Sequence, residues 1–139
     1  MGLVEKAERT SLFRVILFYL LALSLLASTI LSIANGHDQS NRLLAWFALM
    51  GLTALNLTSV PFLWGQRRLS ALMNDETTRD HRRSSLATGF WAMLLATAAT
   101  ITVSFFIPLS AITLGRIVVT AGLTAALIAF STLELRASR

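Results

Sequence analysis

The chain contains no cysteine, only two prolines, and few charged side chains, which make up 14% of its 139 residues. The lack of cysteine excludes disulfides, thiolate zinc sites, iron–sulfur clusters and cysteine nucleophiles. The low charge content does not fit an ordinary soluble domain, in which about 25% of residues are charged. Apolar residues make up 55%, and the mean hydropathy is +0.67. Because so little polar surface cannot cover a compact globule, we expect the apolar excess to face lipid.

Long apolar runs are plentiful, and four of them have the length of about 20 residues that a membrane-spanning helix needs. The first three contain no Lys, Arg, Asp, Glu or His, and the fourth contains a single charge. Since backbone groups find no water in hydrocarbon, each run is expected to be a helix. The predicted spans are residues 15–33, 43–64, 86–106 and 111–133.

Lysine and arginine are distributed unevenly around these spans. Ten of the twelve lie before the first span, in the loop 65–85 or after the fourth span, and only Arg42 and Arg116 lie on the other side. This bias predicts an inner (plasma) membrane protein with both termini and the loop 65–85 in the cytoplasm. Proximity to an anionic leaflet also explains the net charge of +5, so we expect no direct nucleic-acid binding.

The connections predict a single all-α domain, an integral membrane four-helix bundle made of two helical hairpins. A short polar loop follows the first span, with turn residues at Asn35 and Gly36. Between the third and fourth spans, Pro108 cannot continue a helix and Ser110 can cap the next one. Small residues favour close packing of this second hairpin. They are Ala92, Ala96 and Thr100 on the third span and Ala121, Gly122, Ala125, Ala126 and Ala129 on the fourth.

The second span is the most polar of the four, with Thr53, Asn56 and Ser59 among its side chains. An unpaired amide near the middle of the membrane costs a few kcal/mol, so Asn56 is expected to bond a neighbouring helix or to line a polar path. Trp46 and Trp64 are separated by about 27 Å along a helix and are predicted to anchor its two interfaces.

Arg116 is the one charged residue inside a predicted span. It lies near the outer end of the fourth span, so its side chain can extend to the outer interface. The alternative is a functional role, as an anion site or as an ion-pair partner of Asp38 in the outer loop.

Several chemistries lack the residues that they need. Neither His37 nor His81 falls inside a span, so a transmembrane haem held by two histidines has no ligands. No span carries Asp or Glu, which argues against proton-coupled transport through an intramembrane carboxylate. No phosphate-binding glycine loop, serine elbow or zinc-protease motif occurs. We therefore expect no enzyme, no metal site and no cofactor.

The stretch from Met73 to Arg83, MNDETTRDHRR, concentrates charge in the middle loop. Asn74 or Asp75 can cap a helix whose first turn holds Glu76, and this helix can run unbroken into the third span. As a metal site the segment is poor, because its histidine and carboxylates do not share one helix face. The candidate residues for docking a partner are Asp75, Glu76, Arg79, Asp80, Arg82 and Arg83.

The Asp-Glu-x-x-Arg pattern within Met73 to Arg79, followed by a basic run and an apolar span, resembles small prokaryotic four-helix membrane proteins of the DUF2178 type. The resemblance covers about twenty residues and implies a membrane partner of a small cytoplasmic regulator. It assigns no role to any single residue.

The sequence thus favours a non-enzymatic membrane interaction protein, either a regulatory partner of a cytoplasmic protein or an accessory subunit of a membrane complex. The alternative is a small oligomeric transporter or channel with a polar path along the second span. The intramembrane candidates for polar contacts are Thr53, Asn56, Ser59 and Arg116.

Overall fold

The structure, a computed structural model, describes residues 3–35, 40–57 and 76–137, with side chains over 12–35, 43–57 and 79–137. The regular elements of these residues are all α-helices, as the sequence predicts. They are α1 (Leu3–Asn35), α2 (Ser40–Leu57), α4 (Glu76–Ser104) and α5 (Ala111–Ala137).

Three of these helices are long and apolar enough to cross a membrane. The qualifying stretches are Leu12–Asn35 in α1, Arg79–Ser104 in α4 and Ala111–Ala137 in α5. In α2 the apolar stretch Leu43–Leu57 is shorter, and the predicted continuation to Trp64 lies outside the described residues. Three of the four predicted spans therefore have a counterpart of sufficient length.

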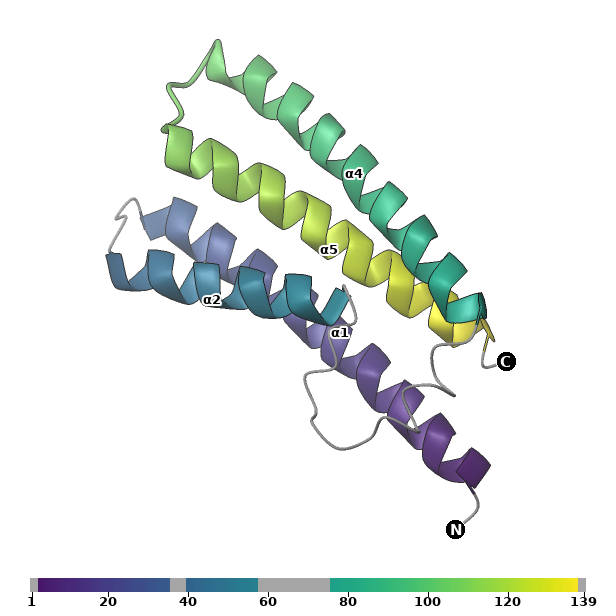
Figure 1. The fold of residues 1–139 in the computed structure, drawn as a ribbon. Coiled ribbons are helices and arrows are strands. Elements are labelled where there is room, and N and C mark those ends of the chain that lie inside the picture. The colour runs from purple at the N-terminus through teal and green to yellow at the C-terminus, as the bar shows by residue number, and fades with distance from the viewer. Residues whose placement is uncertain (1–2, 36–39, 58–75, 138–139) are drawn as a thin grey trace.

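Helix α5 lies in the middle of the molecule, with α4 on one side and α1 and α2 on the other (Figure 1). It packs most extensively against α4 and α1 and also contacts α2. The start of α1, the start of α4 and the end of α5 gather at one end of the structure (Figure 1). α5 thus runs antiparallel to both of its principal neighbours.

The apolar core lies between α1, α2 and α5, and none of the described side chains of α4 belongs to it. On α1 the buried residues recur every three or four positions, with Leu21 and Ala22 adjacent, which places them on one helix face. This face meets the buried residues of α5, where the rings of Phe18 and Phe130 lie 5.4 Å apart. Leu25 and Leu127 are fully buried members of the same core.

Small residues bring α4 and α5 together. A Cβ atom built on Gly89 would lie 2.8 Å from the carbonyl oxygen of Gly122 and 2.9 Å from the Cβ of Ala126. Of the small residues predicted to pack on the fourth span, Gly122 and Ala126 lie at this contact with α4. On α4 the contact is made by Gly89, three residues before the predicted Ala92.

Two features of the helices agree with the sequence analysis. α4 is helical from Glu76, its first described residue, without a break into the predicted third span, whereas the predicted cap at Asn74 or Asp75 lies outside the described residues. In the turn before α5, the backbone N–H of Thr113 donates to Ser110 Oγ at 3.1 Å, which confirms the predicted cap. A serine oxygen at this position satisfies one of the donors that a helix start leaves unpaired.

Candidate functional site

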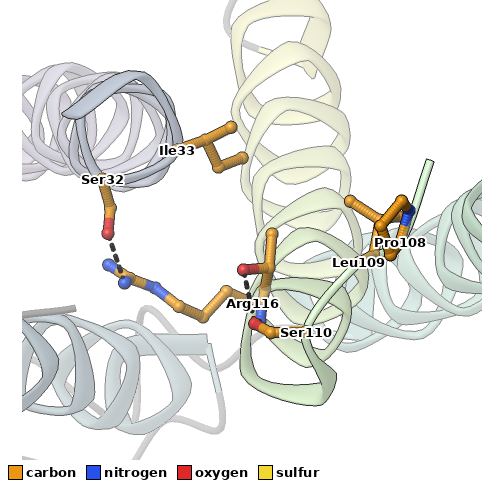
Figure 2. A pocket seen from close by; sticks show the side chains of 7 residues that line it. Ser32, Ile33, Pro108, Leu109, Ser110 and Arg116 are labelled. Carbon is orange, nitrogen blue, oxygen red and sulfur yellow. Dashed lines mark hydrogen bonds between the residues drawn. The ribbon is translucent and has the colours of Figure 1, made fainter. Parts of the chain in front are cut away.

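Arg116 points into the helix bundle. Its side chain is only 4% exposed, and its NH1 group donates a 2.6 Å hydrogen bond to Ser32 Oγ on α1 (Figure 2). Its guanidinium carbon also lies 5.6 Å from the ring centroid of Trp46 on α2. One arginine thus contacts two other helices, and the prediction that it extends to the outer interface is wrong. Asp38, the predicted ion-pair partner, lies outside the described residues.

A second polar layer lies one helical turn further along α5, at Thr120. Its hydroxyl lies 2.9 Å from the hydroxyl of Thr29 and accepts a 3.3 Å hydrogen bond from the indole N–H of Trp46. Because this bond satisfies the indole inside the bundle, Trp46 can be 4% exposed and belong to the core. The prediction of an interfacial anchor is therefore wrong for Trp46, and Trp64 lies outside the described residues.

A cavity of about 370 Å³ lies beside Arg116, between the end of α1 and the start of α5 (Figure 2). The polar side chains of its lining already have partners: Ser32 accepts from Arg116, and the hydroxyls of Ser110 and Thr113 lie 2.8 Å apart. These contacts connect α1 to α5 and cap α5. Among the described residues of the lining, none has a carboxylate, thiol or imidazole that could act as an acid or a base.

At the opposite end of the same helix pair, Arg14 of α1 forms an ion pair with Glu134 of α5. The guanidinium carbon of Arg14 also lies 5.2 Å from the ring centroid of Phe130. Arg82 of α4 lies close enough for the charges of both residues to act on it. The three helices α1, α4 and α5 therefore meet in a charged cluster at this end.

The Arg14–Glu134 ion pair and the Arg116–Ser32 hydrogen bond are separated by the same number of residues on α1 and on α5. Arg14 and Ser32 are 18 positions apart on α1, as are Arg116 and Glu134 on α5. At 1.5 Å per residue the separation is about 27 Å. The apolar core of a bilayer is about 30 Å thick. The interval between the two contacts therefore matches the thickness of the hydrocarbon region.

The charged start of α4 forms a hollow of about 520 Å³, which we call the α4 hollow. Its side chains Arg79, Asp80 and Arg83 are exposed, and Arg82 is partly buried. Four of the six predicted docking residues thus lie together, joined by Leu86, which the sequence analysis did not include. Of the other two, Asp75 lies outside the described residues, and Glu76 is the first residue of α4.

The predicted polar residues of the second span bond within their own helix. Thr53 is fully buried, and its hydroxyl donates to the carbonyl of Leu49 at 2.7 Å. The side-chain amide of Asn56 donates to the carbonyl of Leu52 at 2.8 Å, so the predicted bond to a neighbouring helix is wrong. Ser59 lies outside the described residues.

Over the described ranges, no three His, Asp or Glu side chains lie close enough to hold a metal ion. The side chains of chemical interest are instead arginines at the two ends of a helical assembly, paired with hydroxyls, a carboxylate and aromatic rings.

The fold and these contacts define an all-α protein, three of whose helices are able to cross a membrane. Comparisons with protein-family models, with curated proteins and with solved structures gave no match to this chain. The resemblance to four-helix proteins of the DUF2178 type therefore stays a prediction.

Proposed function

We propose that the protein is a non-enzymatic, multi-pass protein of the inner (plasma) membrane that binds another protein through the charged start of α4. Its large exposed apolar side chains support insertion in a membrane. On α4, Phe90, Trp91 and Leu95 are 59–70% exposed, and burying such groups in an apolar medium is worth about 1.5–3 kcal/mol each. In water this surface would favour aggregation.

The distribution of arginine supports a direction of insertion. The Arg14–Glu134 end of the molecule also carries the start of α4, with Arg79, Arg82 and Arg83, and the end of α5, with Arg136. A concentration of positive charge on one side favours the cytoplasm. We therefore propose two helical hairpins with both termini cytoplasmic.

The observation that carries the proposed interaction is the exposure of charge at the start of α4. Within the described part of the chain, no ion pair engages Arg79, Asp80 or Arg83. A cytoplasmic regulator or a neighbouring subunit of a membrane complex would meet these groups at the membrane surface. Charged groups of both signs in one place favour a specific partner, because a partner with the wrong charge pattern is repelled.

The alternative, a transporter or channel with a path along α2, has less support from the geometry. A path needs polar groups directed into an open space, whereas the hydroxyl of Thr53 and the amide of Asn56 bond to carbonyls of their own helix. Thr53 is also fully buried.

The test is affinity purification of the full chain from mild detergent, followed by measurement of the stoichiometry of any partner. The charge-reversal variant Glu76→Lys/Asp80→Lys should lose a stoichiometric partner. Glu5→Lys/Glu8→Lys, with the same change in net charge at the other cytoplasmic segment, should keep it. A homo-oligomer without a partner, combined with solute flux into liposomes containing only this protein, would establish the alternative instead.

A further inference from the structure

The α4 hollow combines charged side chains with an apolar one. The described residues that line this volume of about 520 Å³ are three arginines, one aspartate and one leucine: Arg79, Asp80, Arg82, Arg83 and Leu86. Three positive charges against one negative charge make the described lining suitable for an anion. The presence of Leu86 on the side of the predicted membrane span makes it suitable for an anion that is attached to an apolar group.

The helical register extends this combination into the membrane. Arg79, Arg83, Leu86, Phe90 and Leu94 follow each other at intervals of four, three, four and four residues, so they share one side of α4. The three apolar members are 45%, 59% and 45% exposed. An exposed apolar strip about two turns long therefore begins where the charged hollow ends. Gly89, which lies between Leu86 and Phe90 in the sequence, faces α5 on another side of the helix.

The arginines of the hollow differ in their surroundings. Arg82 is partly buried and interacts electrostatically with Arg14 and Glu134. It therefore belongs to the charged cluster of α1, α4 and α5. Arg79 and Arg83 are exposed on the side that leads to the apolar strip. A guanidinium group presents paired N–H donors that match the oxygens of a phosphate. These two residues are therefore the phosphate ligands that the site offers.

The carboxylate of Asp80 limits which phosphate groups the hollow can bind favourably. A carboxylate in the lining repels a phosphate with two negative charges, but it can accept a hydrogen bond from a hydroxyl group. A phosphodiester carries one negative charge, and a headgroup with free hydroxyls would supply the donor. The lining thus fits a singly charged phosphodiester with a hydroxylated headgroup better than it fits a phosphomonoester.

We infer that the α4 hollow binds one anionic phospholipid with a hydroxylated headgroup, with its phosphate on Arg79 and Arg83 and an acyl chain along Leu86, Phe90 and Leu94. Basic pockets beside transmembrane helices are suited to such lipids, because each cation near the surface adds to the attraction of an anionic headgroup. The inference rests on the membrane insertion in the proposed function. The lipid would occupy part of the charged surface that is also proposed to bind a protein, and the variants below distinguish the two.

The experiment measures bound lipid by native mass spectrometry on the full chain, purified in detergent and mixed with phosphatidylglycerol. One tightly bound phosphatidylglycerol per chain is expected, with weaker binding of phosphatidate and of zwitterionic phosphatidylcholine. Soluble glycerol 3-phosphate, which has a phosphate but no acyl chain, should not compete at equal concentration. Equal binding of phosphatidylcholine, or effective competition by glycerol 3-phosphate, would overturn the inference.

Two variants locate the site. Arg79→Gln/Arg83→Gln should weaken phosphatidylglycerol binding about tenfold to thirtyfold, as expected from the attraction that two surface cations contribute. The control Arg136→Gln removes an exposed arginine of α5 at the same end of the molecule and should keep the affinity. Equal weakening in both variants would mean that the lipid responds only to overall charge, which would overturn a defined site. The lipid comparison on the unaltered chain needs no variant to fold.

This experiment separates the lipid inference from the proposed protein interaction. The lipid readout uses purified protein and changes two arginines, whereas the partner readout uses stoichiometry and changes two acids. If Arg79→Gln/Arg83→Gln lost a protein partner but kept phosphatidylglycerol unchanged, the hollow would be a protein-docking surface and the lipid inference would be wrong.

Discussion

Replacing Gly89 by alanine should loosen the packing of α4 on α5. The added methyl group would lie 2.8 Å from the carbonyl oxygen of Gly122 and 2.9 Å from the Cβ of Ala126, closer than such atoms pack in proteins. Neither of these atoms can rotate away, because one is backbone and the other is a Cβ. The helices must therefore separate, and overpacking of this kind costs about 1–3 kcal/mol.

Two other glycines provide matched controls. A Cβ on Gly51 or on Gly115 would meet nothing within 4 Å. At these positions alanine should be neutral or stabilising, because it is favoured over glycine in a helix by about 0.5–1 kcal/mol. Gly122→Ala is an intermediate case, since its Cβ would meet the flexible side chain of Met93 as well as backbone.

The assay is reversible unfolding of the purified chain in mixed micelles, with SDS as the denaturant and helicity followed by circular dichroism. Gly89→Ala should lower the free energy of unfolding by about 1–3 kcal/mol relative to Gly115→Ala. The comparison with Gly115→Ala removes the contribution of helix propensity, which is the same in both variants. Equal stability of these two variants would refute the close approach of α4 and α5 at Gly89.

Three further predictions concern contacts between other helices and the topology. Trp46→Phe should lower the free energy of unfolding by about 0.5–1.5 kcal/mol, because it removes the N–H donor to Thr120 and keeps a ring; no change would mean that this bond adds nothing. Arg14→Gln should cost about 1–2 kcal/mol, since it removes the ion pair between Arg14 and the mostly buried Glu134, and Arg14→Gln/Glu134→Gln should recover part of the loss in a double-mutant cycle. A reporter enzyme fused to the C-terminus should be active only in the cytoplasm, and a periplasmic signal would contradict the proposed orientation.

Local features of the sequence predicted much of the helical framework. The continuous helix from Glu76 into the third span was predicted from the local pattern of charged and apolar residues, which depends only on neighbouring positions. The cap by Ser110 followed from its place after Pro108. The small residues Gly122 and Ala126 also marked a face for close packing, because only small side chains let two helix backbones approach.

The same reasoning failed where a side chain has two chemically acceptable environments. Trp46 is typical of a membrane interface, and Arg116 near the end of a span is expected to reach water. Both lie instead in the bundle, where Thr120 and Ser32 supply hydrogen-bond partners from α5 and α1. Asn56 was expected to bridge two helices and bonds its own backbone. Which environment a polar side chain adopts depends on partners that are distant in the sequence.

The candidate site shows the same division. The sequence identified Arg79, Asp80, Arg82 and Arg83 as one charged surface, because residues so close together on a helix cannot be far apart in space. It did not identify Arg14 and Glu134 as partners, although each is a charge at the border of an apolar run. Their pairing requires the antiparallel register of α1 and α5, two helices that are separated in the sequence by the rest of the chain.

The sequence by itself determined the helical class of this protein, the approximate helix boundaries and the uneven distribution of positive charge. These properties follow from composition and from interactions between residues a few positions apart. Only the tertiary structure decided that α5 is the central helix, that Arg116 and Trp46 are internal, and that α4 packs through Gly89. The physical reason is that apolar helices of similar composition can pack in many registers, and the choice among them depends on the fit of side chains across the helix interfaces.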